Sequence, residues 1–209
     1  PRGPRRLLRE AKRPLVIAGL GARAPARAAA LRRLCECRGI PALVTYKAKG
    51  VVADDHPLYA GLFTAGEIER PLIERADLLL TIGLDPVELL PRAWQWGHPI
   101  VHCASWPAAR DQVPRGETIL GDLAAALELA KECLPRASDW SAEEIAAHRD
   151  RQRCAVLLRG GGLTPGSAVA AIAEASGSAR HVTVDAGAHM FPAVALIPAP
   201  VPPRILISN

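Results

Sequence analysis

Three residues whose types suit ligand binding lie close together near the end of the 209-residue sequence: Asp185, Gly187 and His189. Residues 181–185 read as a short buried strand, and a second strand is predicted at 204–208. The three residues would then follow the carboxyl end of the first strand, where open α/β sheets place their ligands. Two strands cannot bury both faces of a sheet by themselves, so we expect polypeptide beyond this sequence to complete the unit. The chain therefore reads as the middle of a larger protein.

A second candidate ligand site is the turn Gly19-Leu-Gly21, which follows one predicted strand and precedes a helix. Glycines at such a turn let the backbone approach a phosphate, whose charge the free N–H groups of the helix start can bind. A NAD site would also carry an acid about 20 residues later, at the end of the next strand. The sequence has Thr45-Tyr-Lys47 there, so NADP, with its 2′-phosphate on Lys47, is the nucleotide to consider. A tight turn that binds no ligand is the alternative.

Alternating strand-like and helix-like segments must position these two sites. Two of the predicted strands, 14–19 and 77–83, are short apolar runs typical of strands covered on both faces, and the helices begin and end at proline, glycine or capping residues. Residues 47–61 read as a long connection with turn residues. The alternation predicts right-handed βαβ units in a Rossmann-like, doubly wound, mainly parallel α/β sheet. The predicted strands are 14–19, 40–46, 77–83, 99–104 and 117–120, and the predicted helices are 25–38, 67–76 and 123–134.

A domain boundary is predicted near the middle of the second half of the chain. Ser141 and Glu144 have the spacing of a capping box, in which each side chain accepts a hydrogen bond from the backbone N–H of the other residue. The helix that they begin is largely polar and ends at three glycines, which is typical of a linker. We therefore predict a nucleotide-binding-like central domain over 1–138, a linker helix over 139–162 and a second, incomplete α/β domain over 163–209.

The composition argues against several classes of protein. Apolar residues make up 49% of the chain, but no run approaches the roughly 18–20 apolar residues of a membrane span. The start of the sequence lacks the pattern of a secretory signal, so we predict a cytoplasmic protein with no membrane partner. The net charge of +5 comes largely from scattered arginines, with only four Trp, two Tyr and two Phe. Nucleic-acid binding is not expected, because it favours clustered basic residues interleaved with aromatic ones.

The five cysteines form no metal-binding pattern. A zinc site needs four convergent ligands, commonly in Cys-x-x-Cys pairs, and the sequence has no such pair. Cys35 and Cys37 are the only close pair, and residues two apart on a helix point about 200° apart. We expect Cys35 to face the core, Cys37 to face the other side, and the thiols to be reduced.

Four segments, in order, resemble the central domain of thiamine-diphosphate-dependent enzymes of the acetolactate synthase, pyruvate oxidase and benzoylformate decarboxylase group. The similarity covers residues 10–135. The tail of the chain resembles the start of the pyrophosphate-binding domain of the same enzymes. The four segments are Arg13-Pro-Leu-Val-Ile-Ala-Gly-Leu-Gly21, Gly39-Ile-Pro41, Lys49-Gly-Val-Val-Ala-Asp-Asp-His-Pro-Leu-Tyr-Ala-Gly61 and Arg75-Ala-Asp-Leu-Leu-Leu-Thr-Ile-Gly83.

This resemblance implies a thiamine-diphosphate- and Mg²⁺-dependent enzyme. In such enzymes the loop after the first strand of the pyrophosphate-binding domain contacts the diphosphate, and it corresponds here to Ala186, Gly187, Ala188 and His189. Gly187 would permit close backbone approach to a phosphate, and the His189 imidazole would donate a further hydrogen bond. Members of the family often have a polar residue at the Ala188 position. A His189 bonded to local backbone is the alternative, and Asp185 would cap or brace the loop.

Some members bind FAD or ADP in the central domain, and two features of that site are missing here. The acid that usually follows the fourth strand is absent from His102-Cys-Ala-Ser-Trp-Pro107, and the arginine expected soon after the third strand comes only at Arg92. We therefore predict a central domain that binds no nucleotide, with FAD or ADP not favoured as cofactor. Gly19 and Gly21 could still contribute to a nucleotide site.

Neither the catalytic glutamate nor the Gly-Asp-Gly…Asn segment that holds Mg²⁺ in this family occurs in the sequence, so no catalytic or metal-binding residue is assigned. We predict a fragment that supplies the central scaffold domain and part of the diphosphate site of a decarboxylase or an acetolactate-synthase-like lyase or transferase acting on 2-oxo acids. The fragment would be inactive alone, and the complete enzyme would be a homodimer or homotetramer. The alternatives are an NADP-binding Rossmann oxidoreductase domain and a non-catalytic structural central domain.

Overall fold

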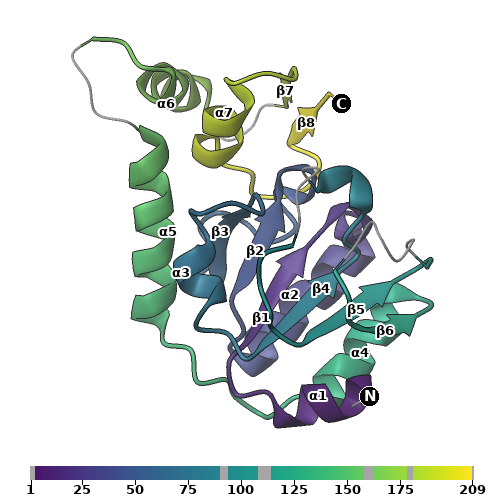
Figure 1. Cartoon of the computed structure of the whole chain (residues 1–209). Coiled ribbons are helices and arrows are strands. Elements are labelled where there is room, and N and C mark those ends of the chain that lie inside the picture. Colours follow the sequence, from purple (N-terminus) through teal and green to yellow (C-terminus); the bar gives the residue numbers. More distant parts are fainter. Residues whose placement is uncertain (1–2, 90–93, 108–113, 158–161, 178–180, 209) are drawn as a thin grey trace.

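The chain folds around a six-stranded parallel sheet (Figure 1). The computed structural model describes residues 3–89, 94–107, 114–157, 162–177 and 181–208. The strands lie in the order β3-β2-β1-β4-β5-β6, so the strand order reverses between β1 and β4. The predicted Rossmann-like α/β fold class is confirmed. The strands are β1 (Pro14–Ala18), β2 (Ala42–Thr45), β3 (Tyr59–Phe63), β4 (Leu78–Ile82), β5 (Ile100–Ala104) and β6 (Glu117–Leu120).

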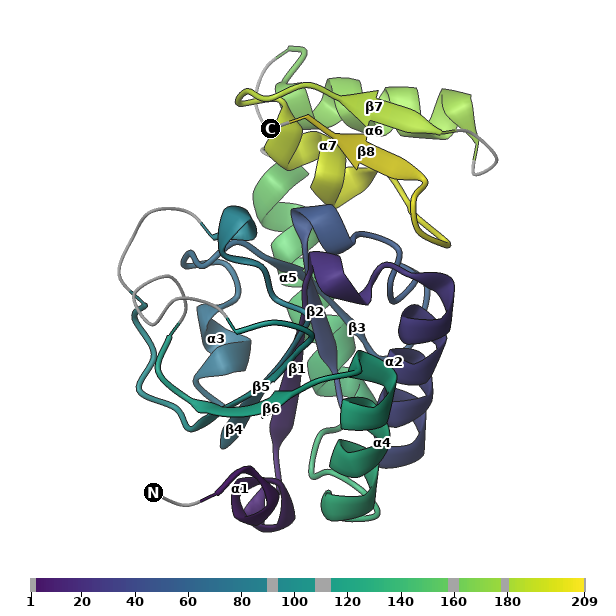
Figure 2. The same ribbon diagram turned by 90° about the vertical axis from the view of Figure 1, so that its right-hand side faces the viewer.

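Helices cover both faces of this sheet, as Figure 2 shows. Strand β1 explains why both faces need cover: Leu15 and Ile17 pack into the cluster under α3 and α5, whereas Val16 and Ala18 pack into the cluster under α1, α2 and α4. All four side chains are fully buried, as expected when successive side chains of a strand point to opposite, covered faces. The helices are α1 (Pro4–Glu10), α2 (Pro25–Arg38), α3 (Arg70–Ile73), α4 (Leu123–Cys133) and α5 (Ala142–Leu157).

The cysteines on α2 lie as predicted. Cys35 is buried, Cys37 is exposed, and both are free thiols. Burial raises the pKa of the Cys35 thiol to about 12, so this group stays protonated and unreactive at neutral pH.

Strand β3 shows that the prediction of a continuous connection over 47–61 is wrong, because the strand begins at Tyr59. Its sequence, Tyr-Ala-Gly-Leu-Phe, is apolar and buried, but a glycine interrupts it, which weakens the strand signal. Tertiary contacts hold both edges of the strand. One edge pairs with β2. At the other edge Gln152 of α5 takes the place of a strand: its Nε2 donates to the Leu62 carbonyl at 2.8 Å, and its Oε1 accepts from the Leu62 N–H at 2.6 Å. A Cβ on Gly61, whose φ is +121°, would collide with the Gln152 amide.

Helix α3 is shorter than predicted, spanning Arg70–Ile73 instead of 67–76. The cause is Glu69, whose side chain is fully buried and whose Oε1 accepts hydrogen bonds from the N–H groups of Thr64 (2.7 Å) and Gly66 (3.0 Å). These bonds hold the preceding residues in a loop. Helix α1 was not predicted at all.

Helix α5 lies against β3 and begins with the predicted capping box, which is confirmed. The Ser141 N–H donates to Glu144 Oε2 at 3.0 Å, and the Glu144 N–H donates to Ser141 Oγ at 3.2 Å. One face of the helix is buried and carries Ile145, His148 and Gln152. The helix thus contributes polar as well as apolar side chains to the interior.

His148 should make the stability of the chain depend on pH. It is 1% exposed, and neither ring nitrogen has a hydrogen-bond partner among the residues that the structure describes. Burial, with Arg151 nearby, lowers its pKa from 6.5 to about 4. Between these two pKa values the unfolded chain binds a proton at His148 and the folded chain does not. Protonation therefore favours the unfolded chain, and the stability that is present above the unfolded pKa is lost as the pH falls. We expect the free energy of unfolding to drop by about 2–3 kcal/mol between about pH 7 and about pH 4.

Urea unfolding at several pH values measures this effect. His148→Leu is expected to flatten the slope and to raise stability near neutral pH by about 1 kcal/mol, because it removes a buried polar group without partners. The exposed His181 provides the control, since His181→Leu should leave the slope in place. An unchanged slope in His148→Leu would show that another group causes it.

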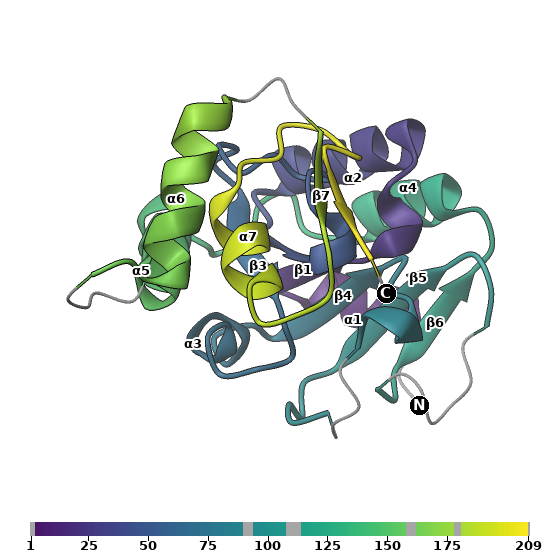
Figure 3. The same ribbon diagram turned by 90° about the horizontal axis from the view of Figure 1, so that it is seen from above.

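The C-terminal residues form a smaller unit above the carboxyl ends of the six strands (Figures 2 and 3). Both predicted strands, 181–185 and 204–208, are present and pair in parallel. Val194 is 1% exposed because it packs into the core cluster of the larger sheet. The elements of this unit are α6 (Pro165–Ser176), β7 (Val182–Val184), α7 (Met190–Leu196) and β8 (Ile205–Ile207).

Candidate cofactor-binding site

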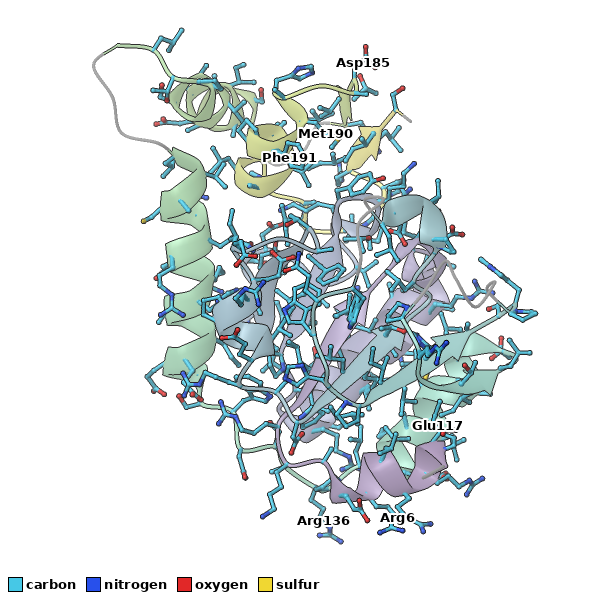
Figure 4. The ribbon with its side chains drawn as sticks, in the orientation of Figure 1. Arg6, Glu117, Arg136, Asp185, Met190 and Phe191 are labelled. Atoms are coloured by element: carbon cyan, nitrogen blue, oxygen red, sulfur yellow. The ribbon has the colours of Figure 1, made fainter. Side chains whose placement is uncertain are left out.

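The loop between β7 and α7 brings the four predicted diphosphate residues together at the surface. Ala186, Gly187, Ala188 and His189 are all exposed and directly follow the carboxyl end of β7. Gly187 has a φ of +151°, and a Cβ there would lie 2.9 Å from Cε1 of the His189 ring, so the ring lies close to the loop backbone. Asp185 Oδ1 accepts from the Ala186 N–H at 2.8 Å. Figure 4 shows Asp185 at the outer end of β7, away from the larger sheet.

This loop offers backbone donors to an anion. Within the described part of the chain, the N–H groups of Gly187, Ala188 and His189 donate no hydrogen bond to another protein group. Strand β8 ends beside the loop, where the Ser208 N–H donates to the Val184 carbonyl at 3.1 Å. Successive free N–H groups next to a glycine form the concave donor sets that bind phosphate oxygens. The N–H groups of this loop are thus donors of the type that a diphosphate requires.

The glycine turn after β1 differs, because its N–H groups already have protein acceptors. The donor–acceptor pairs are Gly19 to the Ile82 carbonyl (2.9 Å), Leu20 to the Glu88 carboxylate (2.8 Å) and Gly21 to the Gly83 carbonyl (2.9 Å). The two predicted phosphate-binding glycines, Gly19 and Gly21, thus lie together at the carboxyl end of β1 but present no free N–H.

Two cavities lie at the carboxyl ends of the six strands, and the loop after β4 borders both. The larger, of about 620 Å³, lies over β4, β5 and β6 and reaches Gly21 and Leu84. The smaller, of about 80 Å³, lies over the ends of β2 and β3 and is lined by Glu88 and by Met190 and Phe191 of α7. Figure 4 shows these last two residues on the helix above the larger sheet.

The larger cavity is lined mostly by small and apolar residues. Trp106 and Arg115 also line it, and its described lining residues include no carboxylate. His102 braces one wall: its Nδ1 accepts from the Thr81 hydroxyl at 2.7 Å, and its Nε2 donates to the Pro114 carbonyl at 2.8 Å. Burial lowers the pKa of His102, which keeps it neutral. Arg92 lies outside the described residues. The nucleotide-free central domain remains a prediction.

A buried ion pair links the C-terminal unit to the larger sheet, and sequence reasoning missed it. Lys49 is 1% exposed, and its Nζ pairs with Asp54 Oδ1 and lies 3.3 Å from the Tyr59 hydroxyl. Asp54 Oδ2 accepts from the Ala199 N–H at 2.8 Å. Burial lowers the pKa of Lys49, and Asp54 opposes this shift. No sequence pattern marks a lysine in a turn-rich segment as buried.

No group of three His, Cys, Asp or Glu side chains that could hold a metal ion is found among the described residues. In the same part of the chain, none of the helices combines the length and apolar character needed to cross a membrane.

Residues 5–129 match the family described as the thiamine pyrophosphate enzyme, central domain. A catabolic acetolactate synthase of Raoultella terrigena is 33% identical over 196 residues, which are 85% of this chain and 34% of that protein. A 2-hydroxyacyl-CoA lyase of Oryza sativa subsp. japonica is 50% identical over 77 residues, 37% of this chain and 12% of that protein. A pyruvate oxidase of Lactiplantibacillus plantarum is 39% identical over 77 residues, 35% of this chain and 12% of that protein.

The chain thus spans about a third of the length of the acetolactate synthase and less of the two other relatives. The family match covers more than half of the chain, and all six strands of the parallel sheet lie within the matched residues. The chain therefore belongs to the thiamine pyrophosphate enzyme family, with residues 5–129 as its central domain.

Proposed function

We propose that this chain supplies the central scaffold and one wall of the diphosphate site of a thiamine-diphosphate- and Mg²⁺-dependent enzyme acting on 2-oxo acids. The observation that carries the proposal is the exposed loop 186–189, in which the N–H groups of Gly187, Ala188 and His189 have no acceptor within the described part of the protein. A decarboxylase or an acetolactate-synthase-like lyase or transferase is the reaction class that the names of the relatives support.

In this proposal the loop binds the cofactor mainly through its backbone. The N–H groups of Gly187 and Ala188 would donate to diphosphate oxygens, and the imidazole of His189 would donate once more. Ala188 brings no side-chain donor, so the backbone carries more of the binding. Asp185 holds the loop through its bond to Ala186.

Thiamine diphosphate, when bound, supplies the carbon centre that attacks the keto group and accepts the charge released when the adjacent bond breaks. The ligands of Mg²⁺ would come from outside the described residues. The assignment of 1–138, 139–162 and 163–209 to a central domain, a linker helix and the beginning of a pyrophosphate-binding domain belongs to the same proposal. The same proposal includes a cytoplasmic location and a homodimeric or homotetrameric complete enzyme.

The two alternatives are less well supported. An NADP-binding oxidoreductase needs a phosphate on the glycine turn, whose N–H groups have protein acceptors here. A purely structural domain would bind no thiamine diphosphate, and the titration below distinguishes it from the proposed site.

Gly187→Val is expected to weaken thiamine diphosphate binding at least about tenfold in the protein expressed from its complete coding sequence. Valine does not readily adopt the observed φ, and its side chain would displace the His189 ring. Isothermal titration with the cofactor and Mg²⁺ measures the effect. Gly177 provides a matched control, because its φ is also positive (+64°) and a Cβ there meets no atom within 4 Å. Unchanged affinity in Gly187→Val, with Gly177→Val folded, would contradict the proposed site.

Measuring decarboxylation by the complete protein and by residues 1–209 shows whether this chain is active alone. The complete protein, with cofactor and Mg²⁺, should release CO₂ from a 2-oxo acid such as pyruvate or benzoylformate. Residues 1–209 alone should not. Decarboxylation by these residues alone would show that the chain holds a catalytic group that the proposal does not assign.

A further inference from the structure

The loop after β4 places a carboxylate inside the glycine turn of the larger sheet. Glu88 is 6% exposed. Its Oε2 accepts from the N–H groups of Leu20 (2.8 Å) and Asp85 (3.0 Å), and its Oε1 accepts from the Thr45 hydroxyl. These donors come from the ends of β1, β4 and β2, which are three neighbouring strands of the sheet. The carboxylate therefore lies where the strand order reverses, which is where such sheets bind ligands.

The surroundings of this carboxylate resemble those of a bound phosphate more than those of an ion pair. Among the described residues, Glu88 forms no salt bridge with Lys, Arg or His. Its negative charge is stabilised by two backbone N–H groups and a hydroxyl, which are the donor types that bind phosphates at glycine turns. Burial raises the pKa of Glu88, and the three donors oppose this shift.

Because Gly19 has no side chain, the Glu88 carboxylate can approach the backbone of the turn, as a phosphate does in a phosphate-binding turn. A Cβ on Gly19 would lie 2.7 Å from Glu88 Oε2, 2.5 Å from the Leu84 Cα and 2.6 Å from the Gly83 carbonyl oxygen. The Asp85 carboxylate caps the short helical turn Pro86–Glu88 by accepting from its backbone, which fixes the loop in place. The glycine makes room for an anion, and the anion is part of the chain.

We propose that the glycine turn is an anion-binding site that the chain fills with its own Glu88, so that the turn is closed to nucleotide phosphates. Glu88 lines the small cavity over β2 and β3, while Gly21 and Leu84 line the large one over β4, β5 and β6. A ligand of the crevice is thus confined to the larger cavity, beside Arg115 and Trp106. The inference concerns a different set of donors from loop 186–189, and it stands whether or not that loop binds thiamine diphosphate.

Four proteins test the proposal: the unaltered chain, Glu88→Ala, Glu88→Gln and the control Glu132→Ala. The alanine variant leaves three donors unpaired and opens the turn to the cavity of about 80 Å³. The glutamine variant removes the charge but keeps the turn filled, since its amide oxygen can accept from Leu20 and Asp85 while its NH₂ group faces Thr45. Glu132→Ala, an exposed substitution on α4, matches the change in net charge.

The probe is inorganic phosphate, followed by titration calorimetry and by the amide NMR signals of Leu20 and Asp85. We expect Glu88→Ala to bind phosphate at least about tenfold more tightly than the other three proteins, with both amide signals moving downfield as it binds. In the unaltered chain neither signal should move with phosphate or with ADP, even if ADP occupies the larger cavity.

Two results would overturn the proposal. One is movement of the Leu20 and Asp85 signals in the unaltered chain at ligand saturation, which would show that the turn is open. The other is a folded Glu88→Ala that gains no phosphate affinity, which would show that the turn does not bind anions. If Glu88→Ala does not fold, the titrations of the unaltered chain and of Glu88→Gln still decide between an open and a closed turn.

Discussion

Gly19→Ala is expected to destabilise the chain by about 3 kcal/mol or to prevent folding, which is at the upper end for an overpacked core. Two of the three atoms that the new Cβ would meet, the Leu84 Cα and the Gly83 carbonyl oxygen, belong to the backbone and lie within 2.6 Å. Neither can rotate away as a side chain would. The chain segments that follow β1 and β4 would have to separate at the carboxyl ends of these strands. Urea unfolding followed by tryptophan fluorescence measures the loss.

Gly97→Ala is the control for this substitution, because a Cβ on Gly97 meets no atom within 4 Å. Its stability should change by no more than about 0.5 kcal/mol. Adding Glu88→Ala to Gly19→Ala should restore little of the lost stability, since the clashes of the new Cβ with the Leu84 Cα and the Gly83 carbonyl oxygen remain. A loss below about 1 kcal/mol in Gly19→Ala would show that the loop after β4 can move away from the turn.

Asp54→Asn is expected to lower the free energy of unfolding by about 3 kcal/mol, because it leaves the charge of Lys49 buried without its partner. The Lys49 side chain has no exposed surface, and the Asp54 carboxylate also holds the Ala199 N–H. The loss should shrink as the pH rises toward 10. A lysine whose folded pKa is lowered is destabilising below that pKa and gains stability as the pH approaches its unfolded value. Chemical denaturation at several pH values tests both expectations.

The double variant Lys49→Met/Asp54→Asn should be more stable than Asp54→Asn alone, because methionine fills the same space without a charge. The exposed pair Arg6–Glu10, with side chains 63% and 47% exposed, provides the control. Arg6→Ala should cost no more than about 0.5 kcal/mol, the usual value of an exposed pair on a helix. Equal losses from Asp54→Asn and Arg6→Ala would contradict a buried role for Lys49.

The fold of the central domain could be predicted because its main signals are local. Four of the five strands predicted in the larger sheet are mainly apolar runs of four or five residues, such as Leu78–Ile82, and three of these four are buried along their whole length. The fifth, β6, begins with Glu-Thr and is only partly buried. Glycine or proline at the ends of α2 fixed where that helix begins and ends. The capping box of α5 and the two faces of Cys35 and Cys37 follow from helix geometry alone.

Strand β3 and the shortened α3 depend on which backbone groups a polar side chain reaches. Strand β3 depends on Gln152, which lies 90 residues beyond Leu62 in the sequence. The shortened α3 depends on how the Glu69 carboxylate folds back on Thr64 and Gly66. Neither Gln nor Glu carries a pattern that says whether its side chain points into solvent or onto a backbone N–H.

The sequence by itself determined the layers of the sheet, the family and the place of the loop 186–189 after a strand, because hydrophobic period, turn residues and motif order are properties of neighbouring residues. Only the tertiary structure decided which anion occupies the glycine turn. The turn was visible as Gly19 and Gly21, but its occupant comes from Glu88, 68 residues after Leu20, to which it is bonded. A backbone donor binds whatever acceptor the fold brings within about 3 Å, whether phosphate or carboxylate. That choice depends on where the loop after β4 lies in space.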